Sequence, residues 1–190
     1  MLTTLSSSID YISIEGLPWI LAAWVGLVAF RPFATLVHES GHLWTAFLLC
    51  KGPLTLRVGR KTDRCLFDGN RIRFEFSLRN GIQGQTEYSE EGLGVLGKVL
   101  ILSAGPLFSL AMSCLAGWLI LRHSLGTWSE VCSVSWFCAN FLAFLRASIP
   151  TTLRPNADFP EGAPSDDMLI ASHVSVSCGA RNKTQDVPLR

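Results

Sequence analysis

The chain has 190 residues, of which 48% are hydrophobic and only 16% are charged. Ordinary soluble domains carry about 25% charged residues. The mean hydropathy is positive, at +0.32, so the composition favours a membrane protein over a soluble domain. The formal net charge of +1 gives no overall field that would attract nucleic acid.

After an N-terminal segment, residues 1–16, the first of three hydrophobic stretches runs from residue 17 to residue 50 and is interrupted by Arg31 and Pro32. A straight helix of this length would span roughly 50 Å at about 1.5 Å per residue, whereas the hydrocarbon core of a bilayer is about 30 Å thick. We therefore expect this helix to tilt, to kink at Pro32, or to extend beyond the membrane at one end.

A polar segment, residues 51–98, separates the first hydrophobic stretch from the second. Apolar and polar residues alternate in it twice, along residues 54–58 and 71–78. A period of two is typical of strands with one apolar face, so we expect a small sheet within residues 51–88, lying at the membrane surface. Ser89-Glu90-Glu91 then predicts the start of a short helix that leads into the second span.

Two further hydrophobic stretches follow the polar segment. Residues 99–121 contain no charged residue and predict a spanning helix. A shorter stretch, about residues 128–147, is also expected to span. Residues 17–170 thus form the predicted membrane core, and the polar residues 171–190 are expected to be a disordered tail.

The distribution of basic residues predicts the orientation. Residues 51–98 contain nine Lys or Arg, whereas residues 122–130 contain one and the N-terminal segment none. Because loops rich in Lys and Arg remain in the cytoplasm, the sheet should lie there. The sequence therefore predicts an α-helical integral membrane protein with about three transmembrane helices and a small cytoplasmic β element between the first and second.

His38-Glu39-Ser40-Gly41-His42 is an H-E-x-x-H motif inside the first hydrophobic stretch. Positions i and i+4 of a helix lie on one face, so both imidazoles can reach one zinc ion. We predict that Glu39 is catalytic and takes a proton from a zinc-bound water, whose pKa the metal lowers towards about 7. Ionisable residues are costly inside an apolar span, which favours a functional site over a chance match.

A catalytic zinc usually has three protein ligands, so one more ligand is required. His123 falls in the loop on the opposite side of the membrane, and His173 falls in the polar tail. A carboxylate is therefore the natural third ligand. Asp158, Asp166 and Asp167 all follow the third span, on the same side of the membrane as the motif.

Taken together, three segments resemble the site-2 protease family of intramembrane zinc metalloproteases. They are the H-E-x-x-H motif late in the first helix, Ala104-Gly105-Pro106 early in the second, and Pro150 followed by Ser165-Asp166-Asp167. Bacterial members carry a proline-containing segment and then Ser-Asp-Gly, whose aspartate is the third zinc ligand. The resemblance therefore implies that zinc is bound by His38, His42 and Asp166, with Asp158 and Asp167 as substitutes for Asp166.

The same resemblance implies a function. We expect hydrolysis of peptide bonds in or near transmembrane segments, with one zinc ion per chain and with Glu39 as general base and then proton donor. The expected partners are the lipid bilayer and a membrane-protein substrate with a single span, and no nucleic acid. The expected location is the bacterial inner membrane, with the active site near the cytoplasmic side.

Three positions depart from the family pattern, and they motivate a second hypothesis. The family often has asparagine where this chain has Ser109 and Ala147, and glycine where it has Asp167. The alternative function is a catalytically inactive zinc-binding membrane module or chaperone-like protein. A zinc transporter is a third hypothesis, because ionisable groups in a span would also serve transport.

Three further features have two interpretations each. The segment 71–78 could pair with an unwound substrate by edge addition, or simply close its own sheet. Asn140 could contact substrate, or form a hydrogen bond between helices. Gly105-Pro106 could bind substrate, or kink the second span and let another backbone approach closely.

Overall fold

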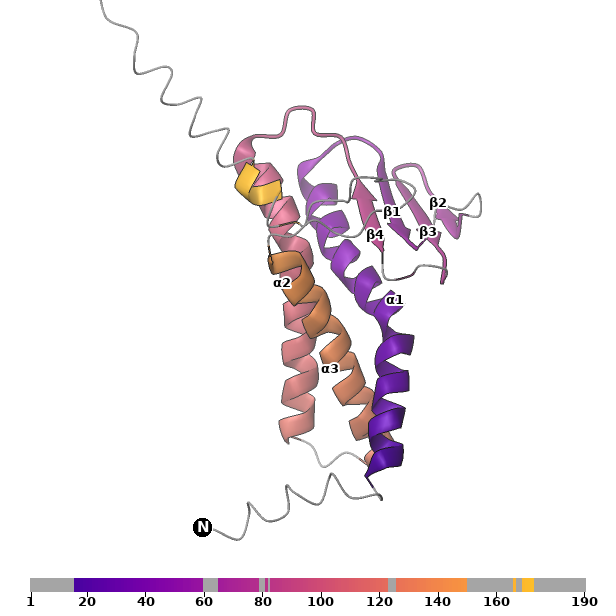
Figure 1. Ribbon diagram of the computed structural model, residues 1–190. Coiled ribbons are helices and arrows are strands. Elements are labelled where there is room, and N and C mark those ends of the chain that lie inside the picture. Colours follow the sequence, from indigo (N-terminus) through magenta and orange to yellow (C-terminus); the bar gives the residue numbers. More distant parts are fainter. Residues whose placement is uncertain are drawn as a thin grey trace, which may run out of the picture.

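A computed structural model of the protein describes residues 16–59, 65–78, 81, 83–122, 126–149, 166 and 169–172. Three long helices stand side by side, and a four-stranded sheet lies beside one end of the first (Figure 1). The helices are α1 (Leu17–Leu49), α2 (Val95–Arg122) and α3 (Thr127–Ser148). The strands are β1 (Leu54–Val58), β2 (Phe67–Asp68), β3 (Ile72–Phe76) and β4 (Gly84–Glu87).

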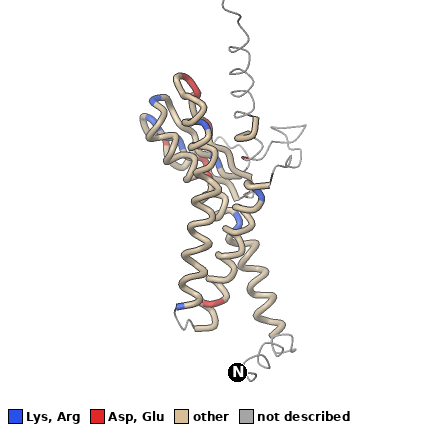
Figure 2. Tube along the Cα trace, turned by 90° about the vertical axis from the view of Figure 1, so that its left-hand side faces the viewer, with Lys and Arg blue, Asp and Glu red and all other residues tan. Residues whose placement is uncertain are grey.

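All three helices are long and apolar enough to cross a membrane. Large apolar side chains on their outer surfaces are exposed; the exposed fractions reach 64% at Val28 and 86% at Leu121. Soluble monomers rarely present apolar surface on this scale. Most charged residues gather at the end of the bundle that carries the sheet (Figure 2). The three predicted helices and the small sheet are confirmed, with α2 beginning at Val95 rather than at residue 99.

Small and polar residues form the contacts between the helices. Gly26 of α1 lies against Ser135 of α3, where a Cβ at position 26 would come within 2.6 Å of the Ser135 Oγ. That hydroxyl donates to the backbone carbonyl of Ala23, at 3.0 Å, and Ser113 of α2 donates to the carbonyl of Phe137, at 3.3 Å. Lipid tails are as apolar as leucine side chains, so close backbone contact and hydrogen bonds hold such helices together.

The sheet has the strand order β2-β3-β1-β4, with β1 and β3 parallel and the other two pairs antiparallel. Leu54, Leu56 and Val58 are buried and share one face of β1, the face that packs against α1. On the opposite face, Arg57 forms an ion pair with the buried Glu75 at 2.9 Å. The two predicted strands and the apolar face of the sheet are therefore confirmed.

Two of the finer expectations for the polar segment have clear outcomes. Strand β3 pairs with β1 on one side and β2 on the other, so the segment 71–78 closes its own sheet. The predicted short helix at Ser89-Glu90-Glu91 is wrong, because no helix begins before Val95 in this connection. Gly92 has a φ of 77°, which lies outside the right-handed helical region, so a helix cannot continue through this residue.

Arg71 attaches the sheet to the C-terminal end of α1. Its guanidinium donates to the backbone carbonyls of Phe47, Cys50 and Gly52, and lies 4.6 Å from the centroid of the Phe47 ring. The last carbonyls of a helix have no partner inside the helix, and a cation there also complements the helix dipole. The contact fixes the sheet beside the half of α1 that contains the H-E-x-x-H motif.

We expect Gly26→Ala to destabilise the purified protein by about 1–3 kcal/mol, because the added methyl group would overlap with Ser135 and push α1 away from α3. Gly117→Ala is the matched control. A Cβ at position 117 would meet the Phe137 ring only at 3.5 Å, an ordinary contact. Thermal unfolding of the two variants in detergent, followed by circular dichroism, measures the difference. Equal melting temperatures would contradict the tight packing at Gly26.

Candidate metal centre

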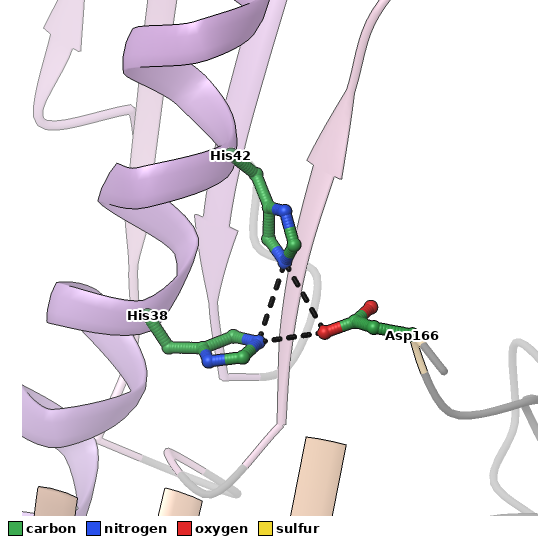
Figure 3. A group of neighbouring side chains, drawn as sticks. All are labelled: His38, His42 and Asp166. Carbon is green, nitrogen blue, oxygen red and sulfur yellow. Dashed lines mark hydrogen bonds and ion pairs between the residues drawn. The ribbon is translucent and has the colours of Figure 1, made fainter. Parts of the chain in front are cut away.

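The H-E-x-x-H motif lies within α1 and is helical throughout. His38 and His42 lie one turn apart and point to the same side of the helix (Figure 3). Their Nε2 atoms are 3.3 Å apart, and both side chains are largely buried. The helical placement predicted from the spacing is confirmed, and both imidazoles reach a common point.

Asp166 meets the two histidines from outside α1 (Figure 3). Its Oδ2 atom lies 2.9 Å from Nε2 of His38 and 3.3 Å from Nε2 of His42. Burial by itself raises the pKa of this carboxyl, but its hydrogen bonds with the two histidines outweigh burial and hold the pKa well below the usual range. The carboxylate is therefore ionised at neutral pH, and the three side chains form a group that can hold a metal ion.

The structure does not describe the other candidate ligands. Asp158 and Asp167, the predicted substitutes for Asp166, lie outside the described residues, as do His123 and His173. Asp166 is separated from His38 by 128 positions, yet the fold brings them into contact. In Figure 1 the last described residues of the chain, drawn in yellow, lie at the sheet end of the bundle.

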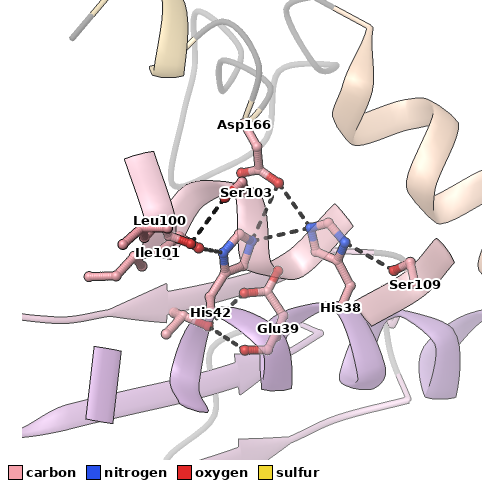
Figure 4. A network of polar contacts seen from close by, with 9 residues as sticks. His38, Glu39, His42, Leu100, Ile101, Ser103, Ser109 and Asp166 are labelled. Atoms are coloured by element: carbon pink, nitrogen blue, oxygen red, sulfur yellow. Dashed lines mark hydrogen bonds and ion pairs between the residues drawn. The ribbon is translucent and has the colours of Figure 1, made fainter. Parts of the chain in front are cut away.

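Each histidine uses its second ring nitrogen for a hydrogen bond (Figure 4). Nδ1 of His42 lies 2.7 Å from the backbone carbonyl of Ile101, and Nδ1 of His38 lies 3.2 Å from the Ser109 Oγ. A carbonyl can only accept, so Nδ1 of His42 carries a proton, and the Ser109 hydroxyl can accept in the same way from His38. With Nδ1 protonated, a metal ion would take the place of the proton that each Nε2 shares with Asp166, and both rings would then have the tautomer that binds a metal.

Glycines and a proline allow α2 to approach the motif. A Cβ at Gly105 would lie 2.2 Å from Nε2 of His42, and a Cβ at Gly41 would lie 2.5 Å from the carbonyl oxygen of Ala104. Pro106 lies inside α2 and has no N–H to donate to the carbonyl of Leu102, the residue after Ile101. The predicted close approach of another backbone at Gly105-Pro106 is confirmed, and it places the Ile101 carbonyl beside His42.

Glu39 is buried next to the metal-binding group, with an exposed fraction of only 7%. Its carboxylate accepts a hydrogen bond from Thr86 of β4, at 2.7 Å, and is not one of the three converging groups. Sequence reasoning missed two of these contacts. Ser109 stood out only as a departure from the family pattern, and Thr86 lies in a strand without alternating apolar residues.

Asn140 is fully buried within α3. Its amide nitrogen donates to the carbonyl of Trp136 in the same helix, at 3.0 Å, and its Oδ1 has no hydrogen-bond partner among the described residues. The predicted hydrogen bond from this side chain to another helix is therefore not found in this part of the chain. The predicted contact with substrate stays a prediction.

Comparisons with protein-family models, with curated proteins and with solved structures gave no match for this chain. Function is therefore inferred from the residues of the site.

We expect Ser109→Ala to weaken metal binding by about 10- to 100-fold, because His38 would lose the group that fixes its Nδ1 proton and ring orientation. Ser113→Ala is the matched control, since Ser113 is equally buried on α2 but donates to Phe137 rather than to a histidine. Competition with a chromophoric chelator measures both affinities. Identical affinities in the two variants would show that Ser109 does not orient His38.

The metal content of purified variants identifies the third ligand. We expect Asp166→Ala to lose the ion, because its carboxylate contacts both imidazoles. Asp158→Ala and Asp167→Ala should retain one ion per chain, as we expect of the wild type. Elemental analysis by mass spectrometry gives the stoichiometry. Retention in Asp166→Ala, with loss in one of the other two variants, would reassign the ligand.

Proposed function

We propose that this chain is an intramembrane zinc metalloprotease of the site-2 protease type, which hydrolyses peptide bonds in or near transmembrane segments of membrane proteins. One observation carries the proposal. His38, His42 and Asp166 converge on one point, with Glu39 buried beside them. The two histidines and the glutamate belong to α1, a helix long and apolar enough to cross a bilayer.

The donor set and its spacing support zinc as the metal. Two imidazole nitrogens and one carboxylate oxygen are a common ligand set of catalytic zinc. A tetrahedral zinc ion with bonds of about 2.0–2.1 Å places its ligand atoms about 3.3 Å apart. The three atoms here are 2.9, 3.3 and 3.3 Å apart. Three protein ligands also leave the fourth position open for water and substrate.

The chemistry divides between the metal and the protein. Zinc would lower the pKa of its bound water towards about 7 and polarise the scissile carbonyl. The carboxylate of Glu39 lies beside the two imidazoles (Figure 4), and it would accept the proton of the attacking water and then give it to the leaving amine. Ile101 and Ser109 hold the two imidazoles in the orientation that binding requires.

The position of the motif along α1 supports a substrate in the membrane. Residues 17–37 account for roughly 30 Å of helix at about 1.5 Å per residue, close to the thickness of the hydrocarbon core. His38 then lies near the boundary of that core, at the end where the sheet and most charged residues gather (Figure 2). Because basic residues favour the inner side, we assign the site to the cytoplasmic side of the membrane. The resemblance to bacterial members of the family makes a bacterial inner membrane the proposed location.

A peptide bond in a spanning helix is shielded by the hydrogen bonds of that helix, so a substrate must unwind before it is cleaved. Among the described strands, β4 pairs only with β1, and it lies beside Glu39. An extended substrate segment could recover backbone hydrogen bonds by adding to this strand. Membrane proteins with a single span are the proposed substrate class, since one helix can enter and unwind without dismantling a bundle.

We expect Glu39→Gln to lower the turnover of a model single-span substrate by about 10²–10⁴-fold, because the amide cannot accept the proton of the attacking water. The variant should still bind one zinc ion, because Glu39 is not a ligand. Glu91→Gln, at an exposed turn, is the matched control and should cleave like the wild type. Equal cleavage by wild type and Glu39→Gln would rule out the mechanism.

Measurements of zinc content, substrate cleavage and metal flux together separate the remaining hypotheses. One bound zinc ion without cleavage of any unwound spanning segment would favour the inactive module, and metal flux across vesicles would favour a transporter. Of the three departures that motivate the inactive module, Ser109 contacts His38, so serine is compatible with an ordered site at that position.

A further inference from the structure

Strand β4 contacts the carboxylate of Glu39 with two of its residues. The Thr86 hydroxyl lies 2.7 Å from Oε2 of Glu39 and 3.2 Å from the backbone carbonyl oxygen of the same residue. Gly84 lies on the same face of the strand, because alternate residues share a face. A Cβ at position 84 would come within 2.5 Å of both Cγ and Oε1 of Glu39. The strand therefore provides both a hydrogen bond and the space that the side chain fills.

These contacts give the carboxylate one orientation. Glutamate is a flexible side chain, and its position in α1 alone does not decide where the carboxylate points. Donation from Thr86 occupies Oε2 and leaves Oε1 as the oxygen that can accept a proton. Figure 4 shows Glu39 between its two histidine neighbours, with one oxygen on the side of Asp166.

The position of Thr86 is set by the sheet rather than by the helices. Thr86 is paired with Leu56 in the antiparallel register of β4 and β1. Leu56 is buried on the face of β1 that packs against α1, and Arg71 holds the sheet to the end of that helix. The sheet thus forms a rigid support that reaches from the end of α1 back to Glu39.

We propose that Thr86 is a positioning residue for the catalytic glutamate: its hydroxyl holds one carboxylate oxygen so that the other faces the attacking water. This inference rests on the proposed function, in which Glu39 is the general base. It makes the sheet part of the active site, in addition to any role as a surface for substrate.

The test compares three threonine variants of the full-length protein. Thr86→Val removes the hydroxyl and keeps the shape, and Thr86→Ser restores a hydroxyl. Thr55→Val is the matched control, because Thr55 belongs to β1 and pairs with Glu87 rather than contacting Glu39. With turnover expressed per bound zinc, we expect Thr86→Val to lower kcat by about 10- to 100-fold at an unchanged KM. Thr86→Ser and Thr55→Val should stay within about threefold of wild type.

Three outcomes would overturn the inference. One is a kcat for Thr86→Val equal to that of Thr55→Val. Another is a loss of bound zinc in Thr86→Val that accounts for the whole loss of activity. The third is a reduction in Thr86→Ser as large as in Thr86→Val, which would indicate a packing role for the side chain.

An infrared measurement tests the contact without turnover. The difference spectrum between wild type and Glu39→Gln isolates the carboxylate stretch of Glu39, and Thr86→Val should shift this band whereas Thr55→Val should not. An unshifted band would overturn the inference. If Glu39→Gln cleaves like the wild type, the proposed function fails and the inference falls with it. If Glu39→Gln is inactive while Thr86→Val keeps its wild-type kcat and band, only the inference fails.

Discussion

Two imidazole nitrogens and one carboxylate oxygen meet within 3.3 Å of each other in a largely apolar helix bundle. Buried acceptors and a buried charge are unfavourable unless something compensates them, and a cation does so directly. The surroundings are consistent with that role. The Ile101 carbonyl and the Ser109 hydroxyl each contact Nδ1 of a histidine ring, so that Nε2 of each ring faces Asp166. Gly105 leaves room for His42 where any side chain would collide with it.

The length of α1 connects this site with the rest of the fold. One part of the helix is long and apolar enough to cross a bilayer, and the part towards its C-terminal end packs against β1 and β4. Because the motif lies between these two parts, the same helix faces α2 with its histidines and β4 with its glutamate. Arg71 keeps the sheet at this end through the carbonyls of the last turn. The ligands and the proposed base are therefore held by different neighbours of a single helix.

Periodic features of the fold could be predicted from the sequence, because each depends on neighbouring residues. The three apolar helices, the strands at 54–58 and 71–78 and the shared face of His38 and His42 follow from local spacing. Strand β4 could not be predicted in this way, because Gly84–Glu87 has no apolar alternation and is ordered by pairing with β1. The choice of Asp166 came from family resemblance alone. Three candidate aspartates, Asp158, Asp166 and Asp167, follow α3, and only the path of the chain decides which one reaches the histidines.

The wide separation of Asp166 from the histidines has a consequence for folding. A bound ion would close a loop of 128 positions, which contains the sheet and both later helices. Closing so long a loop restricts the unfolded chain strongly, as a covalent cross-link would, and an ion that binds only the folded state raises stability by mass action. The ion would thus cross-link α1 to the residue at position 166, near the other end of the membrane core. Its removal by a chelator would therefore lower the stability of the folded state.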